Sequence, residues 1–130
     1  MAVDFKNTRV LVIDDEGYIR RLICKSLRQL DILNIYEAEE GQYGLQQVVR
    51  VRPHLVLCDI HMEPVDGLTF LRKLRAAKLE SIRNTPVVFL TGDSHIDTVV
   101  KARDLEPNGY MVKPVSVTDL RQRIQSVLDK

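Results

Sequence analysis

Short apolar runs alternate along the chain with longer stretches in which apolar residues recur every three or four positions. The short runs are rich in β-branched residues and are bounded by polar ones, which predicts strands. Five strands are expected, at 9–13, 34–38, 55–58, 87–90 and 110–112. The first, third and fourth are almost continuously apolar, a pattern typical of parallel strands that are covered on both faces.

The stretches between and after the strands have the period of amphipathic helices. Their apolar stripes lie within 19–30, 45–49, 68–74, 96–100 and 120–128. The last stripe follows Ser116-Val117-Thr118-Asp119, which has the spacing of a capping box. A strand and a helix therefore alternate five times. Because right-handed crossovers place helices on both faces of a parallel sheet, this order predicts a doubly wound α/β fold with a five-stranded parallel sheet.

Size and charge narrow the class of protein. A chain of 130 residues is the usual size of one domain, so a single domain over 1–130 is expected. The formal charge is +1, from 19 basic and 18 acidic residues, without the basic excess that general nucleic-acid binding requires. No apolar run approaches the length of a membrane span, and the start of the chain lacks the pattern of a secretory signal. A cytoplasmic protein with no nucleic-acid or membrane partner is expected.

Candidate chemistry gathers where the predicted strands end. In an open parallel sheet, ligand sites lie beyond the carboxyl ends of the strands. Four of the five predicted strands are followed directly by charged, hydroxyl-bearing or small residues. These are Asp14 and Asp15 after the first strand, Asp59 after the third, Thr91 and Gly92 after the fourth, and Lys113 and Pro114 after the fifth. Three carboxylates, a hydroxyl and an ammonium are thus expected at one edge of the sheet.

This set of groups suits phosphoryl transfer. Clustered carboxylates repel one another, and a hard cation such as Mg²⁺ relieves that repulsion while it keeps several waters. A carboxylate oxygen of Asp59 beside such a cation can attack phosphorus. Lys113 would supply a compact positive charge to a phosphoryl oxygen, Thr91 would donate a hydrogen bond to another, and Gly92 would leave room for the group to approach.

With the run Asp59-Ile60-His61-Met62 and the pair Asp66-Gly67, these residues resemble a bacterial response-regulator receiver domain of the CheY-like type over essentially the whole chain. The resemblance implies a flavodoxin-like fold and a site that uses Mg²⁺ or Mn²⁺. It implies the following roles: Asp14 and Asp15 bind the metal, Asp59 binds the metal and accepts the phosphoryl group, Thr91 is the switch hydroxyl, and Lys113 senses the phosphate.

The resemblance implies three further features. The backbone carbonyl of His61 would be the third protein ligand of the cation. Tyr110 matches an aromatic residue that moves between exposed and buried positions, although an ordinary half-buried strand residue fits the same pattern. The Lys113–Pro114 peptide bond matches one that is usually cis in the family.

Two positions depart from the family's pattern. The family often has proline four residues after the phosphoacceptor, where this chain has Glu63 followed by Pro64. A Gly-Ala pair commonly precedes the fifth strand, and here Glu106-Pro107 stands in its place. Proline at 107 restricts the residue before it, so a stiffer loop is expected.

The function that the resemblance implies is a phosphorylation-dependent switch in a two-component phosphorelay. A histidine kinase or histidine phosphotransfer protein would supply the phosphoryl group, and the receiver itself would catalyse the transfer to Asp59 and its later loss. The change would reach an unknown downstream target through the fourth helix (from about 96 to 105), the fifth strand with Tyr110, and the fifth helix. Both a stand-alone regulator and a receiver cut from a longer chain fit the sequence.

The basic face of the first helix has two interpretations. A solvated face is the simpler one, and a docking face for a kinase is the alternative. Its residues are Arg20, Arg21, Lys25 and Arg28.

Two other functions are possible on the same fold. An aspartyl-phosphate phosphatase also uses an aspartate after a strand with Mg²⁺, but such enzymes usually carry a second aspartate two residues later, where this chain has His61. A flavin-binding protein would need a hydroxyl- and glycine-rich phosphate loop after the first strand, where Asp14-Asp15-Glu16 would repel phosphate unless a metal intervened.

Overall fold

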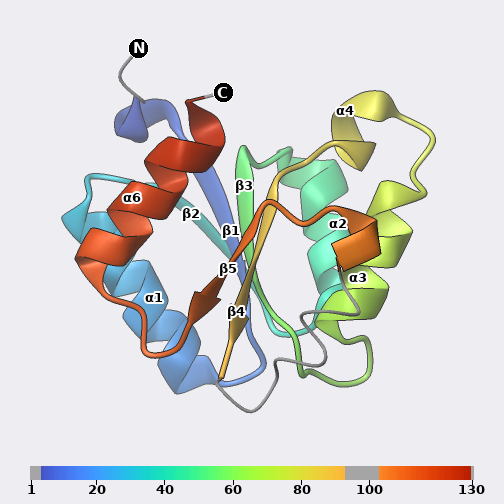
Figure 1. The fold of residues 1–130 in the computed structure, drawn as a ribbon, viewed down its shortest axis with the longest axis horizontal. Coiled ribbons are helices and arrows are strands. Elements are labelled where there is room, and N and C mark those ends of the chain that lie inside the picture. The colour runs from blue at the N-terminus through green and yellow to red at the C-terminus, as the bar shows by residue number, and fades with distance from the viewer. Residues whose placement is uncertain (1–3, 93–102, 130) are drawn as a thin grey trace.

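The computed structural model describes residues 4–92 and 103–129. Its centre is a five-stranded parallel sheet in the order β2-β1-β3-β4-β5 (Figure 1). The strands are β1 (Arg9–Ile13), β2 (Asn34–Ala38), β3 (Leu55–Asp59), β4 (Val87–Thr91) and β5 (Gly109–Val112). The predicted doubly wound α/β fold is confirmed. Strands β3 and β4 each run one residue further than expected, so that Asp59 and Thr91 belong to the sheet itself.

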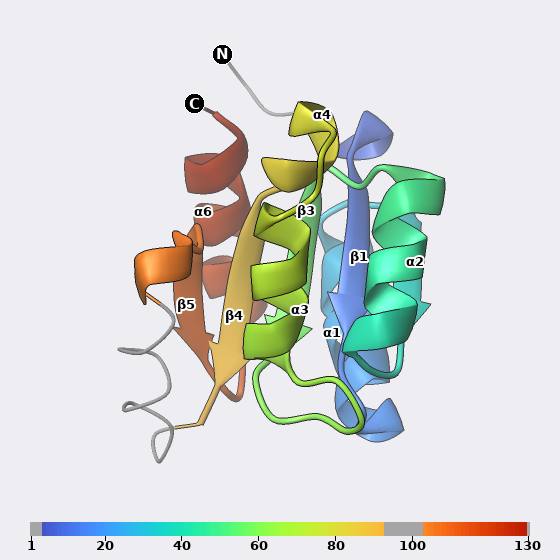
Figure 2. The same ribbon diagram turned by 90° about the vertical axis from the view of Figure 1, so that its right-hand side faces the viewer.

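Helices cover both faces of this sheet (Figures 1 and 2). One face carries α1 (Gly17–Gln29) and α6 (Val117–Leu128), and the other carries α2 (Gly41–Val51) and α3 (Gly67–Arg75). Two short elements were not predicted, η1 (Phe5–Asn7) and α4 (Glu80–Arg83), and a third, η3 (Arg103–Leu105), lies where the fourth helix was expected to end. The rest of that expected helix, from about 96 to 102, lies outside the described residues. Within the described residues, no helix has the length and apolar character needed to span a bilayer.

The strands alternate their side chains between two apolar layers. Leu11 and Ile13 of β1 are fully buried in the layer under α2 and α3, whereas Val10 and Val12 are fully buried in the layer under α1 and α6. Every residue of β3 and β4 is buried, as their continuous apolar sequences predict. The central strands are therefore held rigidly from both sides, and so are the residues at their ends.

Two helix starts bear on the geometry of the sheet edge. Ser116 Oγ accepts a hydrogen bond from the Asp119 N–H at 3.1 Å, which confirms the predicted cap. Asp66 caps α3 in the same way through the Thr69 N–H at 2.8 Å. Gly67 then packs so closely on the end of β3 that an added Cβ would collide with the carbonyl oxygen of Asp59. A side chain at 67 would thus displace either α3 or Asp59.

At the other end of α3, the Arg75 guanidinium fastens the helix to the segments on either side of β4. It donates hydrogen bonds to five acceptors, which are the carbonyl oxygens of Arg83 and Thr85 at 2.8 Å, those of Leu105 and Glu106 at 3.2 Å, and Asn108 Oδ1 at 3.3 Å. The Asn108 Oδ1 also accepts from the Val87 N–H at 2.9 Å. The loop that contains Glu106-Pro107 is therefore tied to both α3 and β4.

Replacing Arg75 with lysine is expected to lower the free energy of unfolding by about 1–3 kcal/mol, because one ammonium cannot reach all five acceptors and leaves partly buried carbonyls without donors. Chemical denaturation of the purified variant measures this loss. Arg72→Lys is the matched control, since Arg72 is exposed on the same helix. Equal stability of the two variants would contradict the role given to Arg75.

Candidate functional site

The carboxylates expected at the sheet edge lie together. Strands β1 and β3 are neighbours with Ile13 opposite Cys58, so Asp14 and Asp59 follow side by side. Asp14 is fully buried and Asp59 is 5% exposed. The carboxylates of Asp14, Asp15, Glu16 and Asp59 each have an oxygen within 4.8 Å of the others. Two buried and two exposed carboxylates therefore share one small volume.

Asp14 is fixed by hydrogen bonds on both its backbone and its side chain. Its N–H donates to the Ala38 carbonyl at 3.1 Å, and its Oδ1 accepts from the Glu16 N–H at 2.9 Å. Its own carbonyl oxygen accepts from Arg20 Nη1 at 2.7 Å. The turn after β1 thus has little freedom to move the acidic pair.

Lys113, which directly follows β5, places a positive charge beside these carboxylates. Its Nζ lies 3.0 Å from Asp14 Oδ2 and 3.4 Å from Asp59 Oδ1. Burial on its own lowers the pKa of Lys113, but the hydrogen bond to Asp14 and the charges of Asp59 and Asp14 outweigh burial, so the pKa is raised. Lys113 is therefore an ammonium at neutral pH, placed between two buried carboxylates.

For Asp59, burial has a larger effect on the pKa than the neighbouring positive charge. Burial raises the pKa of its carboxyl above the ordinary value, Lys113 lowers it and Asp14 raises it again, with a net upward shift. Lys113 alone thus does not fully offset the loss of water around Asp59 in the metal-free protein. A further cation at this edge would favour the ionised form.

The hydroxyl and glycine expected after β4 lie at the same edge. Leu90 is the neighbour of Asp59 across β3 and β4, so Thr91 stands one residue further along. Thr91 is buried, and its hydroxyl donates to the Gly92 carbonyl at 3.1 Å. The Lys113 N–H donates to the Thr91 carbonyl at 2.8 Å, which links the ends of β4 and β5.

A polar hollow of about 580 Å³ opens beside the acidic cluster. It is lined by Asp15, His61, Met62, Glu63, Pro64, Asp66 and Thr69. The loop closes despite its departure from the family's pattern, because the Gly67 N–H donates to the Ile60 carbonyl at 2.8 Å. The Glu63–Pro64 and Lys113–Pro114 peptide bonds are both cis. His61 is exposed in this loop, and the role of its carbonyl stays a prediction.

Tyr110 is half-buried, with its ring stacked on Phe89 at a centroid distance of 6.1 Å and an interplanar angle of 28°. Phe89 is fully buried and is the neighbour of Tyr110 across β4 and β5. Both interpretations of Tyr110, as a moving aromatic and as an ordinary strand residue, are compatible with this position.

The residues present fit a hard divalent cation. All the clustered donors are carboxylate oxygens, which Mg²⁺ prefers, and two of the four belong to exposed residues, which leaves the site open to water. No histidine or cysteine belongs to the cluster, so a softer metal would lack its preferred ligands among the described residues.

Residues 10–125 match the family model of the response regulator receiver domain. The chain belongs to this family. It is a receiver domain of CheY-type response regulators, which is consistent with a phosphorylation-dependent switch in two-component signalling. Receiver domains generally bind Mg²⁺, in agreement with the acidic cluster.

Similar proteins cover nearly the whole receiver. It is 27% identical to chemotaxis protein CheY-3 of Vibrio cholerae, over 99% of this chain and 98% of that protein. It is 34% identical to transcriptional regulatory protein PdtaR of Mycobacterium tuberculosis, over 94% of this chain but 57% of that protein. The crystal structure of the receiver domain of NtrX from Brucella abortus has a TM-score of 0.82 at 26% identity, with coverage of 93% and 98%.

One expectation about the first helix was wrong for Arg20. A solvated basic face was predicted, but the Arg20 side chain is only 13% exposed and contacts the Asp14 carbonyl and Glu37. The helical periodicity gave no sign of this, because both partners lie outside the helix. Arg21, Lys25 and Arg28 are exposed as expected.

Replacing Asp59 with asparagine is expected to stabilise the metal-free receiver at neutral pH. The pKa of Asp59 is higher in the folded chain than its ordinary value of 3.8. Between the ordinary pKa and the raised pKa of the folded chain, the folded state binds more protons than the unfolded state. The wild type therefore gains stability as the pH falls through this window. The advantage of Asp59→Asn should be largest at neutral pH and should disappear below the unfolded-state pKa.

Thermal unfolding in a chelator, from neutral to acidic pH, measures this difference. Asp104→Asn serves as the control, since Asp104 is exposed and distant in the sequence from the cluster. An Asp59→Asn variant that is less stable than the wild type at neutral pH would contradict the conclusion that the buried Asp59 carboxylate destabilises the metal-free fold.

Proposed function

We propose that Asp59 is the phosphoacceptor of this receiver and that Asp14, Asp15 and Asp59, with the carbonyl of His61, hold Mg²⁺ or Mn²⁺. The observation that carries the proposal is the position of Asp59. It is buried at the end of β3, within 4.8 Å of three other carboxylates, and its Oδ1 lies 3.4 Å from Lys113 Nζ. The carboxylates of Asp15 and Glu16 are exposed, and both oxygens of Asp14 already have close partners, the Glu16 N–H at 2.9 Å and Lys113 Nζ at 3.0 Å.

The transfer itself requires little beyond placement. An oxygen of Asp59 forms a bond to phosphorus as the bond from phosphorus to the donor's leaving atom breaks, and the electron pair leaves with the donor. Mg²⁺, when bound, neutralises negative charge on the phosphoryl oxygens. Lys113 supplies a second positive charge, and the Thr91 hydroxyl can turn from the Gly92 carbonyl to a phosphoryl oxygen. Gly92 presents no side chain that would obstruct the group.

The phosphoryl donor is a phosphohistidine on a histidine kinase or histidine phosphotransfer protein. The receiver catalyses both the transfer to Asp59 and the later hydrolysis of the aspartyl phosphate. We place it in the cytoplasm, as one domain over 1–130. Both Cys24 and Cys58 are free and buried, which fits a reducing compartment.

The signal leaves through the elements that Lys113 and Thr91 border. Lys113 directly follows β5, and Tyr110 lies within that strand. A phosphoryl group at Asp59 would draw Lys113 from Asp14, which it contacts at 3.0 Å, and would thereby shift β5. The downstream target is therefore expected to read the fourth helix, β5 with Tyr110, and α6.

Incubation of the receiver with acetyl phosphate and Mg²⁺ is expected to add one phosphoryl mass. Asp59→Asn should abolish the addition, and Asp15→Ala should slow it by at least about tenfold, because a hard cation needs anionic oxygens. Intact-mass spectrometry over time measures both effects. Asp119→Asn is the control, since Asp119 is exposed in the first turn of α6. Labelling of Asp59→Asn at the rate of the wild type would refute the assignment.

A further inference from the structure

Arg20 joins the turn of the acidic pair to strand β2 through one guanidinium. Its Nη1 donates to the carbonyl oxygen of Asp14 at 2.7 Å, and its Nε donates to Glu37 Oε1 at 2.9 Å. The side chain is only 13% exposed, although Arg20 lies in the first turn of a surface helix. The fork of a guanidinium suits two acceptors that lie in different directions.

The two anchors of Asp14 both lead to the end of β2. The Asp14 N–H donates to the carbonyl of Ala38, and the Asp14 carbonyl reaches Glu37 through Arg20. Glu37 and Ala38 are consecutive residues. The backbone of Asp14 is thus held on both its polar groups by one short segment, while its side chain accepts from the Glu16 N–H and pairs with Lys113.

We propose that Arg20 is a positioning residue of the Mg²⁺ site, which holds the Asp14 backbone so that the carboxylates of Asp14 and Asp15 face the cation. This inference rests on the proposed function, because it assumes that these carboxylates bind Mg²⁺. Arg20 contacts neither the cation nor the phosphoryl group in this role. It acts through the carbonyl of Asp14.

The positive charge of Arg20 and its positioning role predict opposite effects of its removal on Mg²⁺ affinity, which makes the inference testable. The Arg20 guanidinium repels Mg²⁺ because both are positively charged. If charge alone mattered, replacing Arg20 with an uncharged residue would strengthen Mg²⁺ binding. Removal of a residue that orients the ligands typically weakens metal binding by about 10- to 100-fold. The sign of the change in affinity therefore distinguishes the two.

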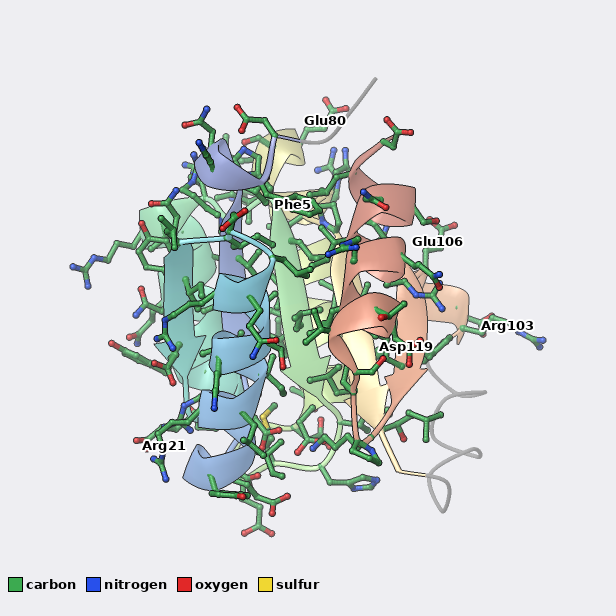
Figure 3. All side chains as sticks on the ribbon, turned by 90° about the vertical axis from the view of Figure 1, so that its left-hand side faces the viewer. Phe5, Arg21, Glu80, Arg103, Glu106 and Asp119 are labelled. Atoms are coloured by element: carbon green, nitrogen blue, oxygen red, sulfur yellow. The ribbon has the colours of Figure 1, made fainter. Side chains whose placement is uncertain are left out.

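Three variants separate these effects. Arg20→Ala removes both the charge and the fork, and Arg20→Lys keeps the charge but cannot reproduce two donors in fixed directions. Arg21→Ala is the matched control, because it removes the same charge from the adjacent position. Figure 3 shows Arg21 on the outer side of α1, and it is exposed.

Mg²⁺ titration followed by backbone amide shifts gives the dissociation constants. Arg20→Ala and Arg20→Lys are expected to bind Mg²⁺ about tenfold more weakly than the wild type, and Arg21→Ala equally or more tightly. Hydrogen exchange in the metal-free proteins gives an independent readout. The Glu16 N–H, which donates to Asp14 Oδ1 at 2.9 Å, should exchange faster in both Arg20 variants.

Each outcome decides one of the two proposals. If the wild type binds Mg²⁺ while Arg20→Lys binds it equally well and leaves Glu16 exchange unchanged, the positioning role is wrong and the metal site stands. If the wild type does not bind Mg²⁺, the proposed metal site is wrong, and faster Glu16 exchange in Arg20→Lys would still show that Arg20 holds the turn. Should Arg20→Ala fail to fold, Arg20→Lys decides the matter.

Discussion

Two carboxylates buried side by side, with one ammonium between them, are the constraint on which this structure depends. Asp14 directly follows β1 and Asp59 ends the adjacent β3, and Lys113 Nζ lies 3.0 Å from Asp14 Oδ2 and 3.4 Å from Asp59 Oδ1. Buried charges are costly to remove from water, and their pairing offsets that cost only when the geometry is held closely. The rigid central strands supply that geometry, because every residue of β3 and β4 is buried.

The proposed function would depend on the same constraint. One ammonium faces two buried carboxylates, and the pKa of Asp59 is raised by burial and, to a smaller extent, by the charge of Asp14, against the opposing effect of Lys113. In the proposed function, a divalent cation would offset this excess negative charge, and a phosphoryl group on Asp59 would change the partners available to Lys113. Because Lys113 directly follows β5, a change in its partners would be transmitted to that edge strand of the sheet. Two arginines hold the surroundings: Arg20 fixes the turn after β1, and Arg75 fixes the loop before β5.

Much of this architecture could be predicted from the sequence, because it follows from local period and strand ends. Continuous apolar runs predicted β1, β3 and β4, and the residues directly after them predicted where Asp14, Asp59 and Thr91 would gather. Helix α4 was missed, since four residues are too few to show a helical period. Arg20 and Arg75 were missed for a different reason. Their acceptors are mostly backbone carbonyls, which every residue carries and which leave no mark in the sequence.

The central claim is that one buried carboxylate, Asp59, forms the acyl phosphate. Borohydride reduces an aspartyl phosphate to homoserine, so peptide mapping after reduction of the phosphorylated wild type locates the modified residue directly. The account predicts homoserine at position 59 and unchanged aspartate at positions 14 and 15. Homoserine at either of these positions, with aspartate intact at 59, would contradict it.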